Sequence, residues 1–518
     1  MVLDFETYRD KVMGCWAGKN IGGVLGAPFE CTRGVTEVDF YTQDLSMGPP
    51  PNDDLDLQIV WLAAVERYGR NVNASILGDY WLSYIIPNWV EYGTGKANLR
   101  AGLVPPMSGF VDNPYKDSCG CFIRSEIWAC LCPGNPELAA RYAYEDASVD
   151  HADEGLYGEI FFAALQSAAF VESDMRRLIE IGLSYVPEDS FLTRAVRKAV
   201  ECHENGVPFR EARVLVHNTA PGTFGIQGCT IKDIPVKDNE GMEIGVSGFD
   251  APENCAFAIL GWLYSDGDFG KAICIANACG EDTDCTCATL GATLGIIMGA
   301  KALPEKWTKP LDDKIATMCI DKTSRGIWVP DTVTQLTDRI LRVTPSFLGL
   351  EHCDILAKGG YTIRCESGDG LFCRSSDDYL PNMNGNGKDK TLPVRELCQL
   401  SSMVSRWDFP AFTVYVDLID SPFIAAGETK KFKVRVINHH SMRQQHWARI
   451  TLYAPDGVAV LGHKQFVLPL NYNWGACAEA TFEIDAEGYN GGRIELLVDV
   501  SLEGRHSTGT AKVVLYNK

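Results

Sequence analysis

The hydrophobic pattern changes its period near residue 410, and this change constrains the fold more than any other feature. Before residue 350, apolar residues recur at helical spacing, as at Phe5, Tyr8 and Val12. After residue 410, six or seven short runs alternate apolar with polar residues, separated by turn signals such as Pro455-Asp456-Gly457. We expect an all-α domain at 1–349, a mixed connector at 350–409 and an antiparallel β-sandwich of immunoglobulin-like type at 410–518.

Charge is distributed unevenly between these parts. The 518 residues carry a formal net charge of −21, whereas the residues from 411 onward hold 11 basic and 11 acidic side chains. The helical part is therefore strongly acidic, which argues against nucleic acid or an anionic membrane as a partner. We see neither a signal-peptide pattern nor an apolar run long enough to span a bilayer. A cytoplasmic protein with reduced thiols is the expectation.

Two acidic segments each open an apolar run. Asn52-Asp53-Asp54-Leu55-Asp56 places three carboxylates within four residues, more than one helix cap needs. Asp282-Thr283-Asp284-Cys285 repeats the arrangement about 230 residues later. Close carboxylates repel one another unless a cation compensates them, so two such helix starts that converge could hold a divalent ion. The pattern alone leaves open the simpler interpretation of two independent acidic helix caps.

The ligand types favour a hard cation. Three C-x-C pairs, at Cys119/Cys121, Cys130/Cys132 and Cys285/Cys287, are more closely spaced than the usual C-x₂₋₄-C zinc pairs and lie in apolar surroundings. We interpret them as buried free thiols. Histidine is scarce in the helical part, so carboxylate oxygens and magnesium are the expected combination.

A glycine-rich segment completes the pattern. Gly18, Gly22, Gly23 and Gly26 precede Glu30, and the three segments follow one another in a fixed order. In order and separation, over about residues 8–345, they resemble the motifs of the ADP-ribosylglycohydrolase family. The resemblance implies an all-α fold in which two Mg²⁺ (or Mn²⁺) ions hold a ribose while the bond at its anomeric carbon is hydrolysed. The implied substrate is a small molecule or an ADP-ribosylated protein.

The resemblance also assigns roles to residues. It implies catalytic roles for Glu30 and Asp53, and substrate contacts in the loop Ser118-Cys119-Gly120 and at His151. We interpret Asp56 as an extra acid that could replace a lost metal ligand or contact a sugar hydroxyl, and Arg124 as a structural ion-pair partner. The implied metal ligands are Asn52, Asp53, Asp54, Asp282, Asp284 and Cys285.

Three departures from the family pattern keep alternatives open. Asn52 and Cys285 replace threonine ligands, and sulfur suits magnesium poorly. Ser118-Cys119 replaces Gly-Asn in the loop that faces the ADP-ribose phosphates in the family. One alternative is a hydrolase of the same fold that acts on a small carbohydrate or nucleoside furanoside. The other is a non-catalytic binding or structural homologue with a degraded metal site. The β-sandwich is a candidate contact for a homo-oligomer.

Overall fold

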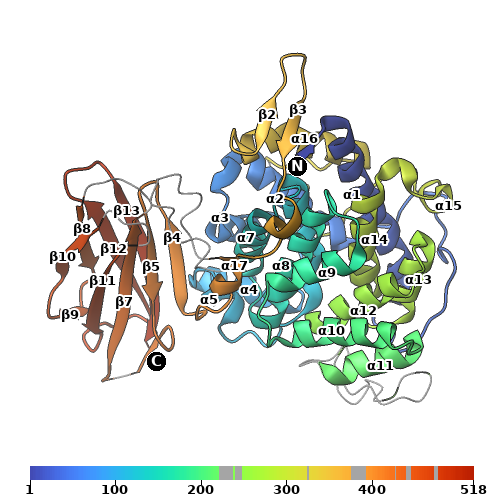
Figure 1. The fold of residues 1–518 in the computed structure, drawn as a ribbon. Coiled ribbons are helices and arrows are strands. Elements are labelled where there is room, and N and C mark those ends of the chain that lie inside the picture. The colour runs from blue at the N-terminus through green and yellow to red at the C-terminus, as the bar shows by residue number, and fades with distance from the viewer. Residues whose placement is uncertain are drawn as a thin grey trace. The chain divides into compact units, whose positions relative to one another are not determined.

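The computed structural model in Figure 1 describes residues 1–220, 237, 239, 248–323, 326–374, 393–425, 427–438, 445–471 and 476–517. Residues 382–390, whose asparagine- and glycine-rich sequence predicts a loop, lie outside the described residues. Two compact units make up the chain: Met1–Ala97 with Ser108–Cys373, and Asn98–Met107 with Arg374–Lys518.

The first unit is helical, as its apolar periodicity predicts. The structure differs from an all-α domain in one small sheet of order β1-β3-β2, because the N-terminal strand β1 (Val2–Leu3) pairs with β3 (Tyr361–Arg364), which in turn pairs with β2 (Cys353–Ile355). A two-residue strand carries no readable alternation. The α-helices that begin before residue 350 are α1 (Phe5–Gly26), α2 (Asp56–Tyr68), α3 (Ala74–Tyr84), α4 (Val90–Ala101), α5 (Met107–Phe110), α6 (Ser125–Leu131), α7 (Pro136–Ala147), α8 (Asp153–Ala169), α9 (Met175–Ser184), α10 (Phe191–Glu204), α11 (Phe209–Thr219), α12 (Ala251–Leu263), α13 (Phe269–Ala278), α14 (Thr283–Met298), α15 (Glu305–Thr308) and α16 (Val333–Leu348).

Helices α1 and α14 pack antiparallel and unusually close (Figure 1). A Cβ atom built on Gly18 would lie 2.0 Å from the carbonyl oxygen of Gly291, and one on Gly22 would lie 2.0 Å from that of Cys287. Only glycine allows backbones to approach this closely. The contact continues to Gly26, which lies against Thr283, so the end of α1 and the start of α14 lie side by side.

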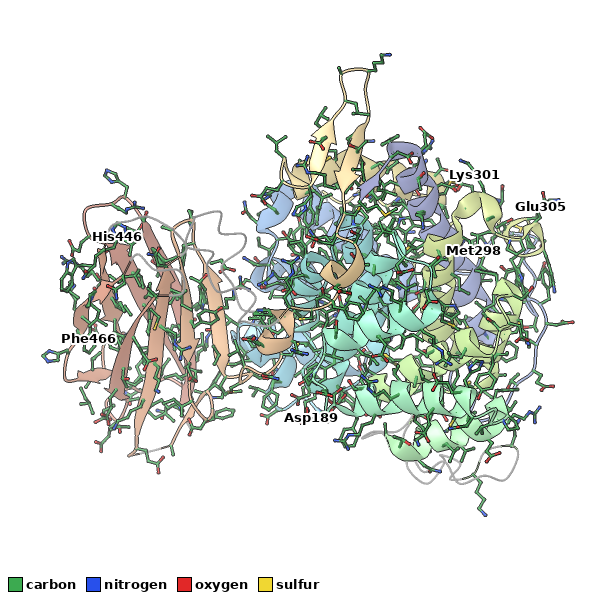
Figure 2. The ribbon with its side chains drawn as sticks, viewed as in Figure 1. Asp189, Met298, Lys301, Glu305, His446 and Phe466 are labelled. Carbon is green, nitrogen blue, oxygen red and sulfur yellow. The ribbon has the colours of Figure 1, made fainter. Side chains whose placement is uncertain are left out.

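The two ends of α14 have different surroundings. Its C-terminus at Met298 is followed by Gly299, whose φ of 78° stops the helix, and by Lys301 (Figure 2). Its N-terminus is buried and carries Asp282 and Asp284. Asp282 and Asp284 therefore lie inside the unit, where burial removes most of the water that would otherwise solvate their charge.

The second unit is rich in strands. Two five-stranded sheets have the orders β10-β8-β12-β13-β6 and β4-β5-β7-β11-β9, and apart from the parallel pair β13–β6 their neighbouring strands are antiparallel. The elements are α17 (Val394–Leu397), β4 (Val404–Asp408), β5 (Phe412–Asp417), β6 (Phe423–Ile424), β7 (Thr429–Asn438), β8 (His446–Tyr453), β9 (Ala459–Leu461), β10 (Gln465–Leu470), β11 (Cys477–Asp485), β12 (Arg493–Leu502) and β13 (Thr508–Asn517).

Alternation places one face of each strand inside this unit. On β11, Ala478, Ala480, Phe482 and Ile484 are buried while the residues between them are more exposed. The rings of Phe466 on β10 and Phe482 on β11 lie 5.3 Å apart, so the two sheets contact each other through apolar side chains. The structure confirms the predicted β-rich C-terminal part.

In the described part of the chain, no helix has the length and apolar character needed to cross a membrane.

Candidate metal centre

Backbone pairing brings Glu30 to the start of α14. The amide of Cys31 donates to the carbonyl of Glu281 at 3.0 Å, and the amide of Glu281 donates back to Thr32 at 3.0 Å. A buried ion pair between Arg33 and Glu281, at 3.1 Å, fastens the same strand-like bridge. As a result, ligand atoms of Glu30, Asp282 and Asp284 lie within 4.8 Å of one another.

The backbone is strained on both sides of this junction. Cys31, next to Glu30, has φ 66°, and Glu281, next to Asp282, has φ 64°. Residues other than glycine rarely adopt such left-handed backbone conformations. The exceptions concentrate at active sites and ligand clamps. The fold retains this strain where it aims two carboxylates at one point.

Asn52 joins the first acidic segment to the second. Its Oδ1 accepts from the amide of Asp54 at 2.7 Å as a helix cap, and its Nδ2 donates to Asp284 at 3.4 Å. Gly23 makes room for this contact, because a Cβ there would lie 3.0 Å from both Asn52 Nδ2 and Asp54 Oδ2. The glycine segment therefore seats the acidic segment as well as α14.

The three aspartates of the first segment have different surroundings. Asp53 is half-buried and accepts from the Tyr92 hydroxyl at 3.4 Å, and burial, with the charge of Asp282 adding to it, raises its pKa to about 6. Asp54 is buried, and neither of its carboxylate oxygens has a hydrogen-bond partner among the described residues. Burial raises the pKa of Asp54 well above its usual range.

Asp56 serves the backbone of another loop. Its Oδ2 accepts from the amides of Met318, at 2.7 Å, and Cys319. Burial outweighs these hydrogen bonds and raises the pKa of Asp56 to about 7. Its predicted contact with a sugar hydroxyl stays a prediction, and the observed partners give this carboxylate an anchoring role.

Among the described residues, no lysine or arginine forms an ion pair with the acids of the centre. Lys19 lies near enough to lower the pKa of Asp54, but its ammonium pairs with Glu126 at 3.2 Å. Asp282 is 3% exposed, and its Oδ1 has no hydrogen-bond partner among the described residues. Unpaired buried carboxylates are costly unless a cation or a proton compensates them.

Glu30 lies on the side of the acid centre that is exposed to solvent. The residue is exposed as a whole, yet its carboxyl faces the other acids, where removal from water and then the charges of Asp282 and Asp53 raise its pKa to about 8. Glu30, Asn52 and Asp53 are more exposed than the buried Asp54 and Asp284. The centre is therefore open to solvent on the side of Glu30 and Asp53.

The loop Ser118-Cys119-Gly120 contacts the centre at Asp282. Its backbone is held by the Cys119 amide, which donates to Phe249 at 2.8 Å. The Cys119 thiol donates to Asp282 Oδ2, and a Cβ on Gly120 would lie 2.1 Å from Glu91 Oε1. Ser118 and Cys119 are both buried.

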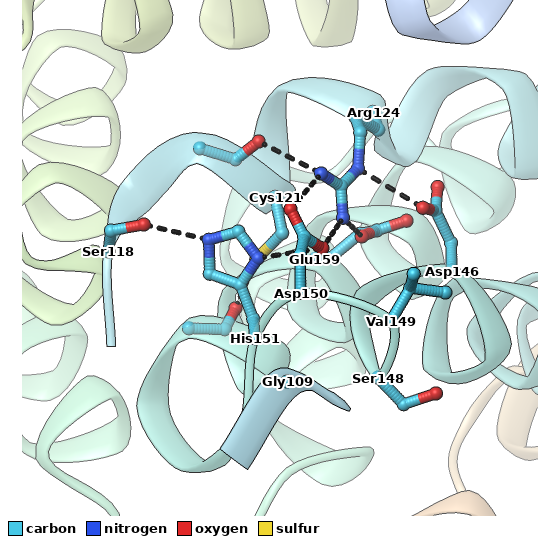
Figure 3. Close-up of polar contacts among 12 residues, drawn as sticks. Gly109, Ser118, Cys121, Arg124, Asp146, Ser148, Val149, Asp150, His151 and Glu159 are labelled. Carbon is cyan, nitrogen blue, oxygen red and sulfur yellow. Dashed lines mark hydrogen bonds and ion pairs between the residues drawn. The ribbon is translucent and has the colours of Figure 1, made fainter. Parts of the chain in front are cut away.

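Behind this loop lies a second acid cluster, built around Arg124 (Figure 3). The Arg124 guanidinium pairs with Asp150 at 2.8 Å, Asp146 at 3.2 Å and Glu159 at 3.6 Å, which confirms its predicted structural ion pairing. His151 Nδ1 lies 3.0 Å from Asp150, and its Nε2 lies 2.7 Å from Ser118 Oγ. Burial would raise the pKa of Asp150, but Arg124 and His151 lower it to about 2.

Most of the predicted residues converge, and some do not reach the centre directly. The side chain of Ser118 contacts His151, and that of Asp56 contacts the backbone of residues 318–319. Three features escaped prediction: the contacts of Glu91 and Tyr92, and the approach of Cys119 to Cys285. Only the repeated C-x-C spacing signalled the third. The predicted residues that lie at the centre are Glu30, Asn52, Asp53, Asp54, Cys119, Asp282, Asp284 and Cys285.

Fold and site together define a helical protein with a buried carboxylate centre between two glycine-packed helices. The sequence matches the profile of the family described as ADP-ribosylglycohydrolase over residues 4–346. The chain therefore belongs to the ADP-ribosylglycohydrolase family, a hydrolase family that typically uses divalent metals, with an additional C-terminal region. No curated protein matches the chain.

Three solved structures show weak likeness. An "ADP-ribosylglycohydrolase-related protein complex" is 17% identical, with 66% of this chain and 99% of that chain covered and a TM-score of 0.40. A FixG-related protein from Vibrio parahaemolyticus is 12% identical, with coverage of 17% and 79% and a TM-score of 0.15. The Pseudomonas fluorescens alkylpurine DNA glycosylase AlkC is 13% identical, with coverage of 90% and 99% and a TM-score of 0.14.

Proposed function

We propose that this chain hydrolyses the bond at the anomeric carbon of an ADP-ribosyl or related ribosyl substrate, a small molecule or a modified protein, with the help of divalent cations. The observation that carries the proposal is the convergence, beside the exposed Glu30, of buried carboxylate oxygens at Asp54 and Asp282 that have no hydrogen-bond partner among the described residues. Membership in the family supports it.

The donor set fits Mg²⁺ or Mn²⁺. Glu30, Asp282 and Asp284 supply oxygen atoms within 4.8 Å of one another, and Asp54 presents two further oxygens from the facing segment. Asn52 and Asp53 would complete the ligands, the carbonyl of Asn52 keeping one lone pair beyond its helix cap. A bound divalent cation would supply positive charge that orients ribose hydroxyls and lowers the pKa of water.

The chain's own carboxyls can take part in the proton transfers. In the metal-free centre Glu30, with a pKa of about 8, holds a proton at neutral pH, and on cation binding it would lose that proton and become a carboxylate that could accept one from water. Asp53, with a pKa of about 6, is ionised at neutral pH and could serve as the same kind of base.

The test is hydrolysis by conservative variants of the full chain. Glu30→Gln should lower kcat by roughly 10²–10⁴-fold, and Asp53→Asn or Asp282→Asn should abolish both activity and cation uptake. Asp44→Asn, an exchange of the same kind at an exposed position, is the matched control. Activity that survives in Asp53→Asn and Asp282→Asn, or that withstands a chelator, would refute the proposal.

One observation favours a second substrate class. The Ser118 hydroxyl is engaged by His151 and the Cys119 thiol by Asp282, and both residues are buried, so this loop offers no free side-chain donor to a pyrophosphate. A small carbohydrate or nucleoside furanoside would not need such donors. Rates of release from ADP-ribosyl-arginine, ADP-ribosyl-serine and simple furanosides would separate the two classes.

The second unit has a proposed role outside catalysis. Its two sheets suit an immunoglobulin-like sandwich that serves as an oligomer contact. Light scattering on the full chain tests this role, and a monomer at micromolar concentration would count against it.

A further inference from the structure

Two cysteines from different C-x-C pairs meet at the candidate centre. Cys119 begins the 3₁₀-helix η4 (Cys119–Arg124), and Cys285 lies in the first turn of α14. Their sulfur atoms and a carboxylate oxygen of Asp282 all lie within 4.8 Å of one another. All three residues are buried. Each pair was too closely spaced to suggest a metal site, but the fold combines one member of each.

The other member of each pair points elsewhere. The Cys121 thiol donates to the carbonyl of Gly155, and the Cys287 thiol donates to that of Ile273 at 3.3 Å. Neither Cys119 nor Cys285 is in a disulfide. Only one thiol of each C-x-C pair therefore lines the centre. The other thiol, Cys121 or Cys287, offers a matched position for a control substitution.

Asp282 supplies an observation independent of the cysteines. Its Oδ2 accepts from the Cys119 thiol, whereas its Oδ1 has no hydrogen-bond partner among the described residues, although the residue is only 3% exposed. A buried carboxylate oxygen without a partner costs roughly 1–3 kcal/mol or more, and a bound cation is one way to compensate it. An ion that accepts electron pairs from both sulfurs and from Asp282 would satisfy it.

We propose that Cys119, Asp282 and Cys285 hold a thiophilic divalent cation of the zinc class. The neighbouring oxygen position formed by Glu30, Asp282 and Asp284 holds the harder cation, and Asp282 serves both. Three protein ligands with one open position are the usual arrangement of catalytic zinc. Sulfur ligands select zinc over magnesium, which takes oxygen. The inference rests on the proposed function only in placing a metal centre at Asp282.

Binding has a defined chemical balance. Each thiol loses its proton to solvent as its sulfur coordinates the cation, so the hydrogen bond from Cys119 to Asp282 is replaced by two metal–ligand bonds. No oxidant or reductant is needed. The centre would then contain two unlike cations, as its two unlike donor groups indicate.

The experiment is cobalt substitution in the full chain under reducing, anaerobic conditions. We expect one equivalent of Co²⁺ to give a sulfur-to-cobalt charge-transfer band that Zn²⁺ abolishes and excess Mg²⁺ does not. Cys119→Ser and Cys285→Ser should each remove about half of the band, and the double variant should remove it all. The matched controls Cys121→Ser and Cys287→Ser should keep the full band.

Two results would overturn the inference: bound Co²⁺ without a charge-transfer band, or a band that survives in the double variant. If the variants fail to fold, the zinc absorption edge of the wild-type chain decides, with two sulfur ligands at about 2.3 Å expected and an all-oxygen or all-nitrogen shell contradicting it. No substrate is present in either measurement. A missing band therefore leaves the proposed hydrolysis standing, and a band in an inactive chain refutes only the hydrolysis.

Discussion

Two clusters of buried acids lie close together in the helical unit, and they differ in whether a protein cation pairs with their carboxylates. Around Arg124, the carboxylates of Asp146, Asp150 and Glu159 surround one guanidinium. Trp128 also donates to Asp146 at 3.0 Å and to Glu159 at 3.1 Å. At the candidate metal centre, Asp54 and Asp282 keep oxygens without partners among the described residues.

The difference shows which cluster has its compensating cation within the protein and which one can take up an added cation. The Arg124 cluster contains its own cation, which forms ion pairs with Asp146, Asp150 and Glu159, as in a structural network. At the metal centre, Lys19 is occupied by Glu126, so the charge of the acids is left for protons or an added cation. Fold stability should therefore depend on the first cluster, and activity on the second.

Removing the internal cation should have the largest effect on stability. Arg124→Met would leave Asp150 and Asp146 buried without their partner, and we expect a loss of about 3–5 kcal/mol in unfolding free energy. Denaturant melts measure this loss. Arg342→Met on α16, an exchange at an exposed site, is the control and should be nearly neutral. A change below about 1 kcal/mol in Arg124→Met would contradict the comparison.

Two neighbouring glycines separate helix packing from the acid centre. Gly22→Ala would drive a Cβ to 2.0 Å from the backbone of Cys287, and we expect a loss of about 3 kcal/mol. Gly23→Ala meets only the side-chain ends of Asn52 and Asp54, at 3.0 Å, so it should cost less stability but weaken cation binding more. Thermal melts and cation titrations of both variants test this order, and the reverse order would refute it.

Neutralising the metal centre should stabilise the metal-free chain. Asp54→Asn replaces a buried carboxyl that has no hydrogen-bond partner among the described residues, so we expect its melting temperature without metal to equal or exceed that of the wild type. The wild type should gain stability on adding Mg²⁺ or Mn²⁺, and the variant should gain little. A variant that melts lower without metal and still responds to cations would show that Asp54 is a structural acid.

The smallest expected effect concerns pH. Burial, with the charge of Asp150 adding to it and His151 opposing it, raises the pKa of Glu91 to about 7. The folded state therefore binds a proton that the unfolded chain has already lost, so wild-type stability should fall as pH rises from about 4.5 through about 7. Glu91→Gln should flatten this slope by on the order of 1 kcal/mol per pH unit. Parallel slopes for wild type and variant would contradict it.

Sequence reasoning reached the fold through periodicity and the centre through spacing. The change of period near residue 410 predicts the helical and strand-rich parts, because each period places one face of an element in the core. The two acidic segments could be paired because both open buried helices. The strand Val2–Leu3 could not be predicted, because its pairing with residues 361–364 depends on tertiary packing.

The details that escaped prediction all depend on distant contacts. The approach of Cys119 to Cys285 requires the docking of η4 on α14, which no local pattern encodes. The same holds for Glu91 against Gly120 and for the engagement of Asp56 by residues 318–319. Residue types and spacing thus located the centre, whereas its division into an oxygen side and a sulfur side required three-dimensional packing.

The most direct test of the central claim is a calorimetric titration of the metal-free chain with Mg²⁺ or Mn²⁺ in two buffers of different ionisation enthalpy. We predict saturable uptake with release of protons, because the cation takes the place of protons on carboxyls such as Glu30, whose pKa is raised to about 8. The Asp282→Asn variant should show neither. Absence of uptake by the wild-type chain, or equal uptake by the variant, would contradict the account.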